Sequence, residues 1–324
     1  MVRRIIDERS VPRRKALRAT IGPLARASVA PKTYDRYLRA ARLFVEWCRL
    51  VRGGDSRDLY TLDLDASAYL EALWEAGEPR ALAGDTLSAI QFFLQTRRIL
   101  SGSWRLLGTW SRLELPARAT PLAWPWVLAF CALALRSGDV GLAAALLLAM
   151  HGMLRTAEML SITPAAVFVG PDGRGALALP WTKTSMKRGA QEMVQILDPL
   201  VGFWVAKACA CCPGPHAPLV AHTLPGFHRK FQELVSAAGL SDLQLRPYGL
   251  RRGGATAHFA LHGRIEDTVF RGRWNSSSTA RIYITEGAAV LAQAKLSAAC
   301  QLHVQQLVAE FARTTRALGI PMSA

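Results

Sequence analysis

Residues 272–283 read Gly-Arg-Trp-Asn-Ser-Ser-Ser-Thr-Ala-Arg-Ile-Tyr, and this stretch decides how the rest of the chain is interpreted. It places Trp274, whose indole N–H is a hydrogen-bond donor, nine residues before Tyr283. A phenol with its ordinary pKa of about 10 is a weak nucleophile unless nearby positive charge favours its phenolate. Taken alone, each residue also fits an aromatic core position. The pair becomes informative through two arginines that precede it.

Arg251 is the last residue of the motif Tyr248-Gly249-Leu250-Arg251 and lies 23 residues before Trp274. Arg155 lies 96 residues before Arg251. A phosphodiester repels nucleophiles, so an enzyme that works without metal must neutralise its charge with fixed cations. Arginine stays charged, and its planar fork meets two phosphate oxygens at once. Read alone, Arg155 also fits a helix surface and Arg251 a basic surface turn. The order of these residues predicts a tyrosine enzyme that transfers a phosphodiester.

These motifs, taken in order, resemble the catalytic domain of the tyrosine recombinase (phage integrase) family over about residues 122–313. The resemblance implies that Tyr283 forms a 3′-phosphotyrosyl link with DNA and that Arg155 and Arg251 bind the scissile phosphate. It places Trp274 where histidine is more usual. The implied activity is site-specific cleavage and rejoining of duplex DNA by a recombinase or integrase of a mobile element.

Two supporting roles follow from the same resemblance. Glu158, three residues after Arg155, stands at the position of an acid that orients this arginine, although a solvent-facing Glu158 fits the sequence equally. The general acid for the leaving 5′-oxygen is usually a lysine in a β-turn. This indicates Lys183 in Trp181-Thr182-Lys183-Thr184, with Lys187 as its competitor.

One position departs from the family pattern. Tyr248 stands where the family has histidine, and Trp274 occupies the other usual histidine position. A phenol can hydrogen-bond a phosphate oxygen or the nucleophile, but it is a poor base near neutral pH. Either the chemistry runs with lysine and the arginines, or the chain is a catalytically decayed or domesticated recombinase that acts as a DNA-binding module. A type IB topoisomerase has similar chemistry, but its longer linker architecture is missing here.

The predicted fold is mostly α with a small antiparallel β-sheet. A basic flexible arm at 1–29 precedes a helical domain at 30–115, similar in arrangement to the family's core-binding domain, and an α+β catalytic domain with a C-terminal helix spans 116–324. The prolines of residues 115–121 indicate a linker. Further predictions are helices at 65–77 with Asp65 as N-cap, 85–100, 103–113, 122–160 and from about 225, three short strands within 166–197, and an apolar stripe at Val304, Leu307, Val308 and Phe311.

The charge balance favours a polyanionic partner, since 40 Lys and Arg face 24 Asp and Glu and the pI is near 10.3. An amphipathic helix over 34–48 has a basic face, which predicts contact with DNA backbone phosphates or, alternatively, a solvated surface. The residues assigned to DNA binding are Lys32, Arg36, Arg39, Arg42, Arg97 and Arg98. The apolar run Val140–Leu154 is shorter than the ~20 residues of a membrane span and indicates a buried helix. No segment has the pattern of a membrane-surface helix.

Double-stranded DNA is therefore the expected partner, without a membrane. The resemblance implies that strand exchange needs no cofactor and that four protomers assemble on two DNA sites, each docking a C-terminal segment into a neighbour. The stripe at 304–311 fits that docking or packing within its own domain.

The remaining expectations concern the compartment and metals. Charges interrupt every apolar stretch near the N-terminus, so no signal peptide is expected, and six cysteines in a chain this long predict a reduced, intracellular protein. Cys209, Cys211 and Cys212 lack a second CxxC pair, so a local turn with buried thiols is favoured over a zinc site, and no metal is expected.

Overall fold

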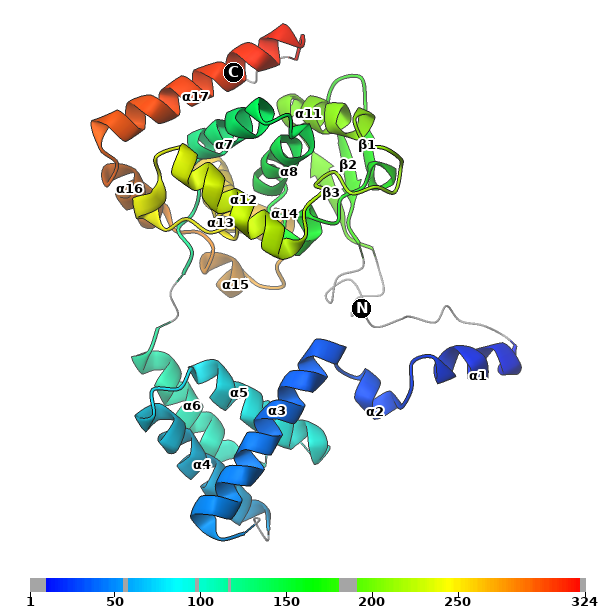
Figure 1. Ribbon diagram of the computed structural model, residues 1–324, viewed down its shortest axis with the longest axis vertical. Coiled ribbons are helices and arrows are strands. Elements are labelled where there is room, and N and C mark those ends of the chain that lie inside the picture. Colours follow the sequence, from blue (N-terminus) through cyan, green and yellow to red (C-terminus); the bar gives the residue numbers. More distant parts are fainter. Residues whose placement is uncertain (1–9, 55–57, 97–98, 116–117, 181–190, 321–324) are drawn as a thin grey trace. The chain divides into compact units, whose positions relative to one another are not determined.

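The computed structural model describes residues 10–54, 58–96, 99–115, 118–180 and 191–320 (Figure 1). The chain forms two compact units, Met1–Ala117 and Arg118–Ala324. Both are built mainly from helices, and the second also contains one three-stranded sheet, which confirms the predicted fold class. Across the described residues, no helix is long and apolar enough to cross a membrane.

Four helices, α3 (Pro31–Trp47), α4 (Leu59–Glu75), α5 (Arg80–Phe93) and α6 (Ser101–Leu113), surround the core of the first unit. The helix expected over 34–48 corresponds to α3, which continues into one further turn, η1 (Cys48–Arg52). Large apolar side chains at helical spacing meet in the centre: Phe44, Tyr69, Leu70, Leu87, Leu107 and Trp110. Each contributes about 2 kcal/mol when buried, so this core holds the four helices together.

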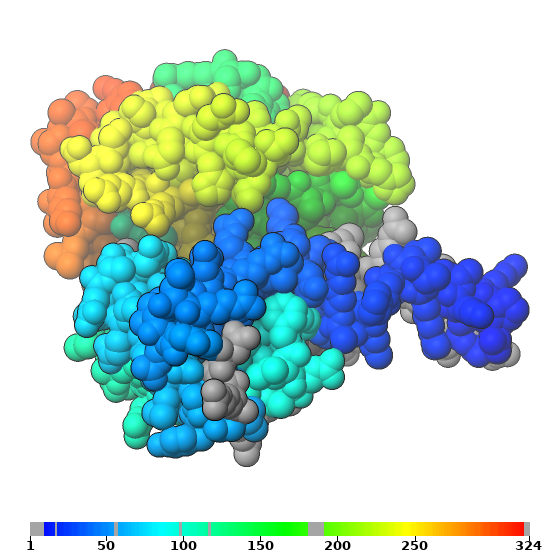
Figure 2. All heavy atoms as spheres, turned by 60° about the horizontal axis from the view of Figure 1, so that its bottom comes forward, coloured from blue at the N-terminus to red at the C-terminus, as the bar shows by residue number. Residues whose placement is uncertain are grey.

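Two short helices, α1 (Val11–Ala19) and α2 (Leu24–Ala27), lie within the basic N-terminal segment. None of their described side chains is buried. Figure 2 shows them as a narrow extension of the first unit. Because they bury little apolar surface, packing contributes little to their stability.

The predicted N-cap of the second helix is wrong. The structure begins α4 at Leu59, and Asp58 is its N-cap, with Oδ1 accepting from the Thr61 backbone N–H at 2.8 Å. Asp65 lies inside the helix, where it is buried and accepts a 2.8 Å hydrogen bond from Arg52 Nε. Both aspartates precede an apolar run, and they are two helical turns apart. The sequence signal for a cap was therefore present at both positions.

The buried helix predicted from the run at 140–154 is α8 (Val140–His151), which lies at the centre of the second unit. Every residue from Leu142 to Met150 is buried. A helix that is apolar on all sides is stable only inside a protein. The helices that contact it are α7 (Trp124–Arg136), α9 (Thr156–Met159), α11 (Pro199–Ala210) and α13 (Gly249–His262). The unit also contains α12 (Leu224–Ala237), α14 (Ile265–Gly272), α15 (Ser277–Arg281), α16 (Glu286–Ala294) and two short turns, η2 (Pro164–Ala166) and η3 (Ser241–Leu243).

The sheet is antiparallel, in the order β1 (Val167–Val169), β2 (Gly175–Ala178), β3 (Met193–Ile196). Its register pairs Val167 with Leu177 and Leu177 with Val194, so that one apolar face packs on the core. The three predicted strands are confirmed. Helix α11, which follows β3, was not anticipated, and Cys209 lies in its last turn with Cys211 at its C-cap.

The C-terminal helix α17 (Ala298–Ala317) packs across α7 of its own chain (Figure 1). Val304, Leu307 and Phe311 are buried, and the rings of Phe311 and Trp204 are 5.5 Å apart between centroids. The apolar stripe at 304–311 is thus part of the core of its own unit. Of the two uses left open for this stripe, the structure shows packing within the chain.

Candidate active site

The first turn of α13 sets Arg251 into the interior of the second unit. Glycines of this helix pack against neighbouring backbone, and a Cβ at Gly254 would lie 2.1 Å from the Met150 carbonyl oxygen. Because α13 approaches α8 this closely, Arg251 is only 1% exposed. Its Nη2 donates to the Gly272 carbonyl at 2.8 Å, and its Nη1 donates to the Met153 carbonyl.

The charge of Arg251 interacts with other cations of the site. Burial, together with the nearby charges of Arg155 and Arg273, lowers the pKa of Arg251 to about 10. The guanidinium therefore remains charged at neutral pH. The fold has also brought Arg155 and Arg251 close enough to interact, although 96 residues separate them in the sequence.

Two aromatic rings cover the Arg251 guanidinium. Its central carbon lies 4.7 Å from the ring centroid of Trp274 and 5.5 Å from that of Tyr283. The Trp274 and Tyr283 rings are 4.7 Å apart between centroids. Trp274 is buried, and its Nε1 has no hydrogen-bond partner among the described residues. This buried indole donor is unsatisfied, and a ligand oxygen reaches it only when neighbouring side chains move aside.

Tyr248 and Tyr283 share a hydrogen bond between their hydroxyl oxygens, 2.5 Å apart. Tyr248 is the N-cap of α13 and is 41% exposed, whereas Tyr283 follows α15 and is half-buried. Burial, followed by the hydrogen bond and the charge of Tyr283, raises the pKa of Tyr248 to about 12. Tyr248 is therefore protonated at neutral pH, and it acts on Tyr283 as a hydrogen-bond donor or acceptor, not as a base.

Arg155 is the N-cap of α9 and is held by Glu158. A Glu158 carboxylate oxygen accepts from the Arg155 backbone N–H at 2.8 Å, and the other accepts from its guanidinium. Burial would lower the pKa of Arg155, but the charge and hydrogen bond of Glu158, together with the charges of Glu192 and Tyr283, outweigh burial and raise the pKa. Glu158 is 3% exposed, so it faces the interior and not the solvent.

The sequence analysis did not identify Arg273, which lies between Glu158 and Trp274 in the site. It has a left-handed backbone (φ 57°) at the C-cap of α14, and its side chain is 8% exposed. Its guanidinium donates to Glu158 at 3.0 Å and to the Gly152 carbonyl at 2.9 Å, and its Nε lies 3.8 Å from a carboxylate oxygen of the buried Glu192. An arginine between a glycine and a tryptophan gave no signal of this position, because both carboxylates come from distant segments.

The predicted general acid, Lys183, and its competitor Lys187 lie outside the described residues, as do Arg97 and Arg98. Both lysines fall between β2 and β3 in the sequence. The remaining residues assigned to DNA binding lie in the first unit.

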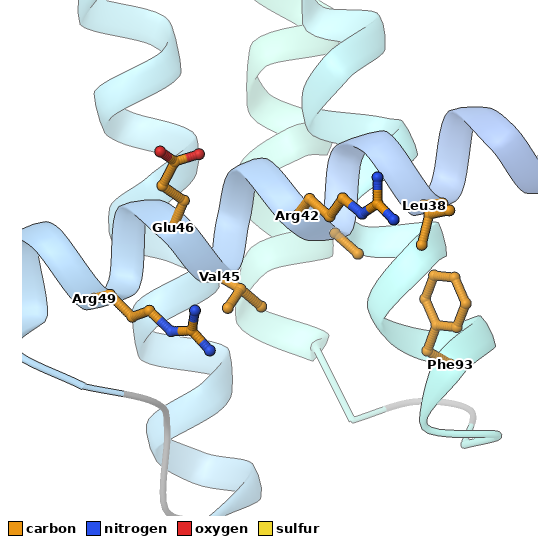
Figure 3. Close-up of a pocket in the computed structure, with 7 residues that line it drawn as sticks. Leu38, Arg42, Val45, Glu46, Arg49 and Phe93 are labelled. Atoms are coloured by element: carbon orange, nitrogen blue, oxygen red, sulfur yellow. The ribbon is translucent and has the colours of Figure 1, made fainter.

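Lys32, Arg36, Arg39 and Arg42 are exposed on α3. Arg36 makes an ion pair of 2.7 Å with Asp85 of α5, so part of its charge is already balanced. Arg42 borders an open groove with an apolar floor (Figure 3). The groove is lined by Leu38, Ala41, Arg42, Val45, Glu46, Arg49 and Phe93.

The described part of the second-unit site thus combines fixed cations, a phenol and an indole donor. Buried arginines in a low-dielectric setting bind an anion without reorganising. Among the described residues, no three His, Cys, Asp or Glu side chains are grouped so that they could hold a metal.

No protein-family model and no curated protein sequence matches the chain. Solved structures do. XerH site-specific recombinase bound to its difH substrate shares 13% identity at a TM-score of 0.52, over 82% of this chain and 79% of that one. The Tn1549 transposon integrase in complex with transposon right end DNA shares 14% identity at a TM-score of 0.57, over 88% of this chain and 98% of that one. A lambda integrase tetramer bound to a Holliday junction shares 15% identity at a TM-score of 0.51, over 85% of this chain and 76% of that one. At this identity the similarity shows a shared fold.

Proposed function

From the tyrosine recombinase fold of this chain, we propose that it cleaves and rejoins duplex DNA through a 3′-phosphotyrosyl intermediate on Tyr283, as a site-specific recombinase or integrase of a mobile element. One observation carries the proposal. The Tyr283 ring lies on the buried Arg251 guanidinium, 5.5 Å from its central carbon, while its hydroxyl is hydrogen-bonded to Tyr248. A cation held beside a phenol favours the phenolate, which is the form of tyrosine that attacks a phosphate.

The scissile phosphate is assigned to Arg155, Arg251 and Trp274. Each Nη of Arg251 uses one N–H for a backbone carbonyl, so each keeps a second N–H for a phosphate oxygen. The Trp274 indole donates to the same phosphate from the side of the Tyr283 ring. Charge that develops on the phosphate oxygens during attack is stabilised by these fixed donors.

In the cleavage step, the Tyr283 oxygen forms a bond to phosphorus and the bond from phosphorus to the 5′-oxygen breaks. The Tyr283 phenol proton passes to solvent water, while Tyr248 keeps its own proton at neutral pH and donates a hydrogen bond to the Tyr283 oxygen as that oxygen ionises. The leaving 5′-oxygen takes a proton from Lys183, with Lys187 as the alternative. Attack by a 5′-hydroxyl on the phosphotyrosine reverses these changes and rejoins DNA, so no nucleotide cofactor is consumed.

The first unit is assigned to the DNA backbone. Lys32, Arg39 and Arg42 are exposed on α3 and suit phosphate contacts, which give affinity and salt dependence but little sequence choice. Assembly of four protomers on two DNA sites is part of the proposal. In the single chain the stripe at 304–311 is buried within its own unit.

The test is covalent capture of DNA. Nicked duplexes from the DNA that flanks the gene, and from a random-sequence library, are incubated with the protein and scored for an SDS-resistant adduct. We expect an adduct with the wild type and none with Tyr283→Phe, whose DNA binding stays nearly intact. An adduct that persists in Tyr283→Phe would show that another residue is the nucleophile. Salt-sensitive binding without any adduct would favour the decayed, DNA-binding alternative.

A further inference from the structure

Arg273 connects the two segments that carry the proposed catalytic residues. Its Nη1 donates to the Gly152 carbonyl at 2.9 Å, and its Nη2 donates to the Glu158 carboxylate at 3.0 Å and weakly to the Met153 carbonyl at 3.4 Å. The Gly152 and Met153 carbonyls lie on the turn from α8 into α9, which also carries Arg155, and Glu158 lies in α9 itself. Arg273 itself is covalently joined to Trp274.

Glu158 is shared between two arginines. The same carboxylate oxygen that accepts from Arg273 also accepts from the Arg155 backbone N–H, and the second oxygen accepts from the Arg155 guanidinium. A buried carboxylate is costly unless it is well paired. If Arg273 were absent, Glu158 would be compensated by Arg155 alone. Its charge would then hold the Arg155 guanidinium more tightly and compete with a phosphate for it.

The charge balance of the site supports the same conclusion. In the described part of the site, the guanidinium groups of Arg155, Arg251 and Arg273 face the carboxylates of Glu158 and Glu192, which leaves one net positive charge. Without Arg273 the same groups would sum to zero. The Arg273 guanidinium pairs with the carboxylates of Glu158 and Glu192, whereas that of Arg251 donates to backbone carbonyls, so Arg273 is assigned to the protein and not to a substrate.

We propose that Arg273 is a positioning residue of the active site: by sharing Glu158 with Arg155, it leaves the Arg155 guanidinium available to the scissile phosphate and fixes Trp274 against Tyr283. This inference rests on the proposed strand-cleavage function. The left-handed backbone at Arg273 places its side chain toward the turn that follows α8 while Trp274 packs on Arg251.

The primary test measures the rate of covalent adduct formation at saturating DNA. Arg273→Asn tolerates the left-handed backbone, so it removes the guanidinium without adding strain. We expect the rate to fall about 10- to 100-fold while the DNA dissociation constant changes less than about 3-fold, because misplacement of a catalytic group affects mainly the chemical step. Arg273→Lys, which keeps the charge, should recover part of the rate. Arg264→Gln, which removes an exposed charge at the other end of α14, is the control for general loss of positive charge.

A second variant separates positioning from a merely structural role. If Arg273 acts by compensating Glu158, then Glu158→Gln placed in the Arg273→Asn protein should raise the adduct rate at least about 3-fold, since it removes the carboxylate charge that holds Arg155. If Arg273 only stabilises the fold, the two losses should instead multiply. Multiplying losses, or an unchanged rate in Arg273→Asn while the wild type forms the adduct, would overturn the role of Arg273 and leave the proposed function standing.

A measurement without cleavage covers the case in which no duplex gives an adduct. In ¹⁵N-tryptophan-labelled protein, the Trp274 indole signal, assigned with Trp274→Phe, is followed during titration with inorganic phosphate. We expect the signal to shift in the wild type and to respond much less in Arg273→Asn. Equal shifts in both proteins would overturn the role of Arg273, and absence of a shift in the wild type would overturn the phosphate site as well.

Discussion

The hydroxyl oxygens of Tyr248 and Tyr283 lie 2.5 Å apart, so the two phenols are joined by a short hydrogen bond. Tyr248 comes from the start of α13 and Tyr283 from the segment after α15, and their rings are 5.9 Å apart between centroids. A raised pKa of about 12 keeps Tyr248 protonated, so Tyr248 is the donor whenever Tyr283 ionises. At the position where the family pattern has histidine, a phenol is thus a neutral hydrogen-bond partner of Tyr283, the proposed nucleophile.

Tyr248→Phe should slow adduct formation without abolishing it. The change removes one hydrogen bond to an oxygen that becomes charged, and such a bond is worth about 1.5–3 kcal/mol, or roughly 10- to 100-fold in rate. DNA binding should be unchanged, because the ring that packs beside Tyr283 remains. Single-turnover kinetics on a nicked duplex measure the effect. A Tyr248→Phe protein as fast as the wild type would show that this hydrogen bond plays no part in the chemistry.

Tyr248→His should introduce a new pH dependence. An imidazole of ordinary pKa near 6.5 accepts a proton only above that pH, so the adduct rate of the variant should rise as the pH passes through about 6.5. The wild type should show no inflection from this position, since the pKa of Tyr248 is about 12. Rate profiles from pH 5.5 to 8.5 for both proteins provide the comparison. Parallel profiles would mean that the residue at 248 does not take part in proton transfer.

Trp274→Phe should separate the indole donor from the aromatic packing. Phenylalanine can still cover Arg251 and lie beside Tyr283, but it has no N–H for the phosphate. Loss of one such donor predicts a fall of about 10-fold or more in adduct rate at saturating DNA. Trp274→His restores a donor and should recover part of the rate. If the histidine variant is no faster than the phenylalanine variant, the indole acts by packing alone.

Much of the fold was predictable because its signals are local. Apolar residues at helical spacing predicted α3 and α8, and alternation broken by turns predicted the sheet. The two aspartates 58 and 65 show where local signals fail, since both satisfy the rule for a cap and only packing of the whole helix selects one. Helix α11 was missed because its sequence is apolar on most sides and ends in a cysteine cluster that reads as a turn.

The sequence motifs of the candidate site were predictable, but the three-dimensional contacts between their residues were not. The order and spacing of Arg155, Arg251, Trp274 and Tyr283 selected residues that the fold places close together. Arg273 escaped notice because its importance comes from Glu158 and Glu192, which lie far from it in the sequence and are recognised as partners only in three dimensions. The hydrogen bond between Tyr248 and Tyr283 likewise follows from folding and not from spacing.

Gly254→Ala should disrupt the site from a distance. The new Cβ would lie 2.1 Å from the Met150 carbonyl oxygen, which belongs to the rigid helix α8, so α13 would have to move. Overpacking of this kind costs about 1–3 kcal/mol. Gly287→Ala in α16 is the matched control, because its Cβ would meet nothing within 4 Å and should stabilise the helix by roughly 0.5–1 kcal/mol. Urea unfolding measures both, and equal stability in both variants would contradict the close helix contact.

His151, the last residue of α8, is held neutral by its surroundings. Its Nε2 accepts hydrogen bonds from the Leu197 backbone N–H at 3.1 Å and from Arg271 at 2.7 Å, so this nitrogen has no room for a proton. Burial, and next the charge of Arg271, lowers the pKa of His151 to about 4, although Asp198 acts in the opposite direction. His258 nearby has its pKa lowered to about 4 as well, by burial and then by His262.

The protein should therefore lose stability on mild acidification. Between pH 6.5 and 4 the unfolded chain binds protons that folded His151 and His258 do not, so the free energy of unfolding falls as the pH drops through this window. For His151 the loss is at most about 3 kcal/mol. His151→Gln, whose amide oxygen can accept the same two hydrogen bonds, should remove part of the pH dependence of stability. The control is the same substitution at the exposed His216, His216→Gln. Urea unfolding at pH 4.5, 5.5 and 7 measures the free energy of unfolding. An unaltered pH dependence in His151→Gln would show that the fold does not lower the pKa of His151.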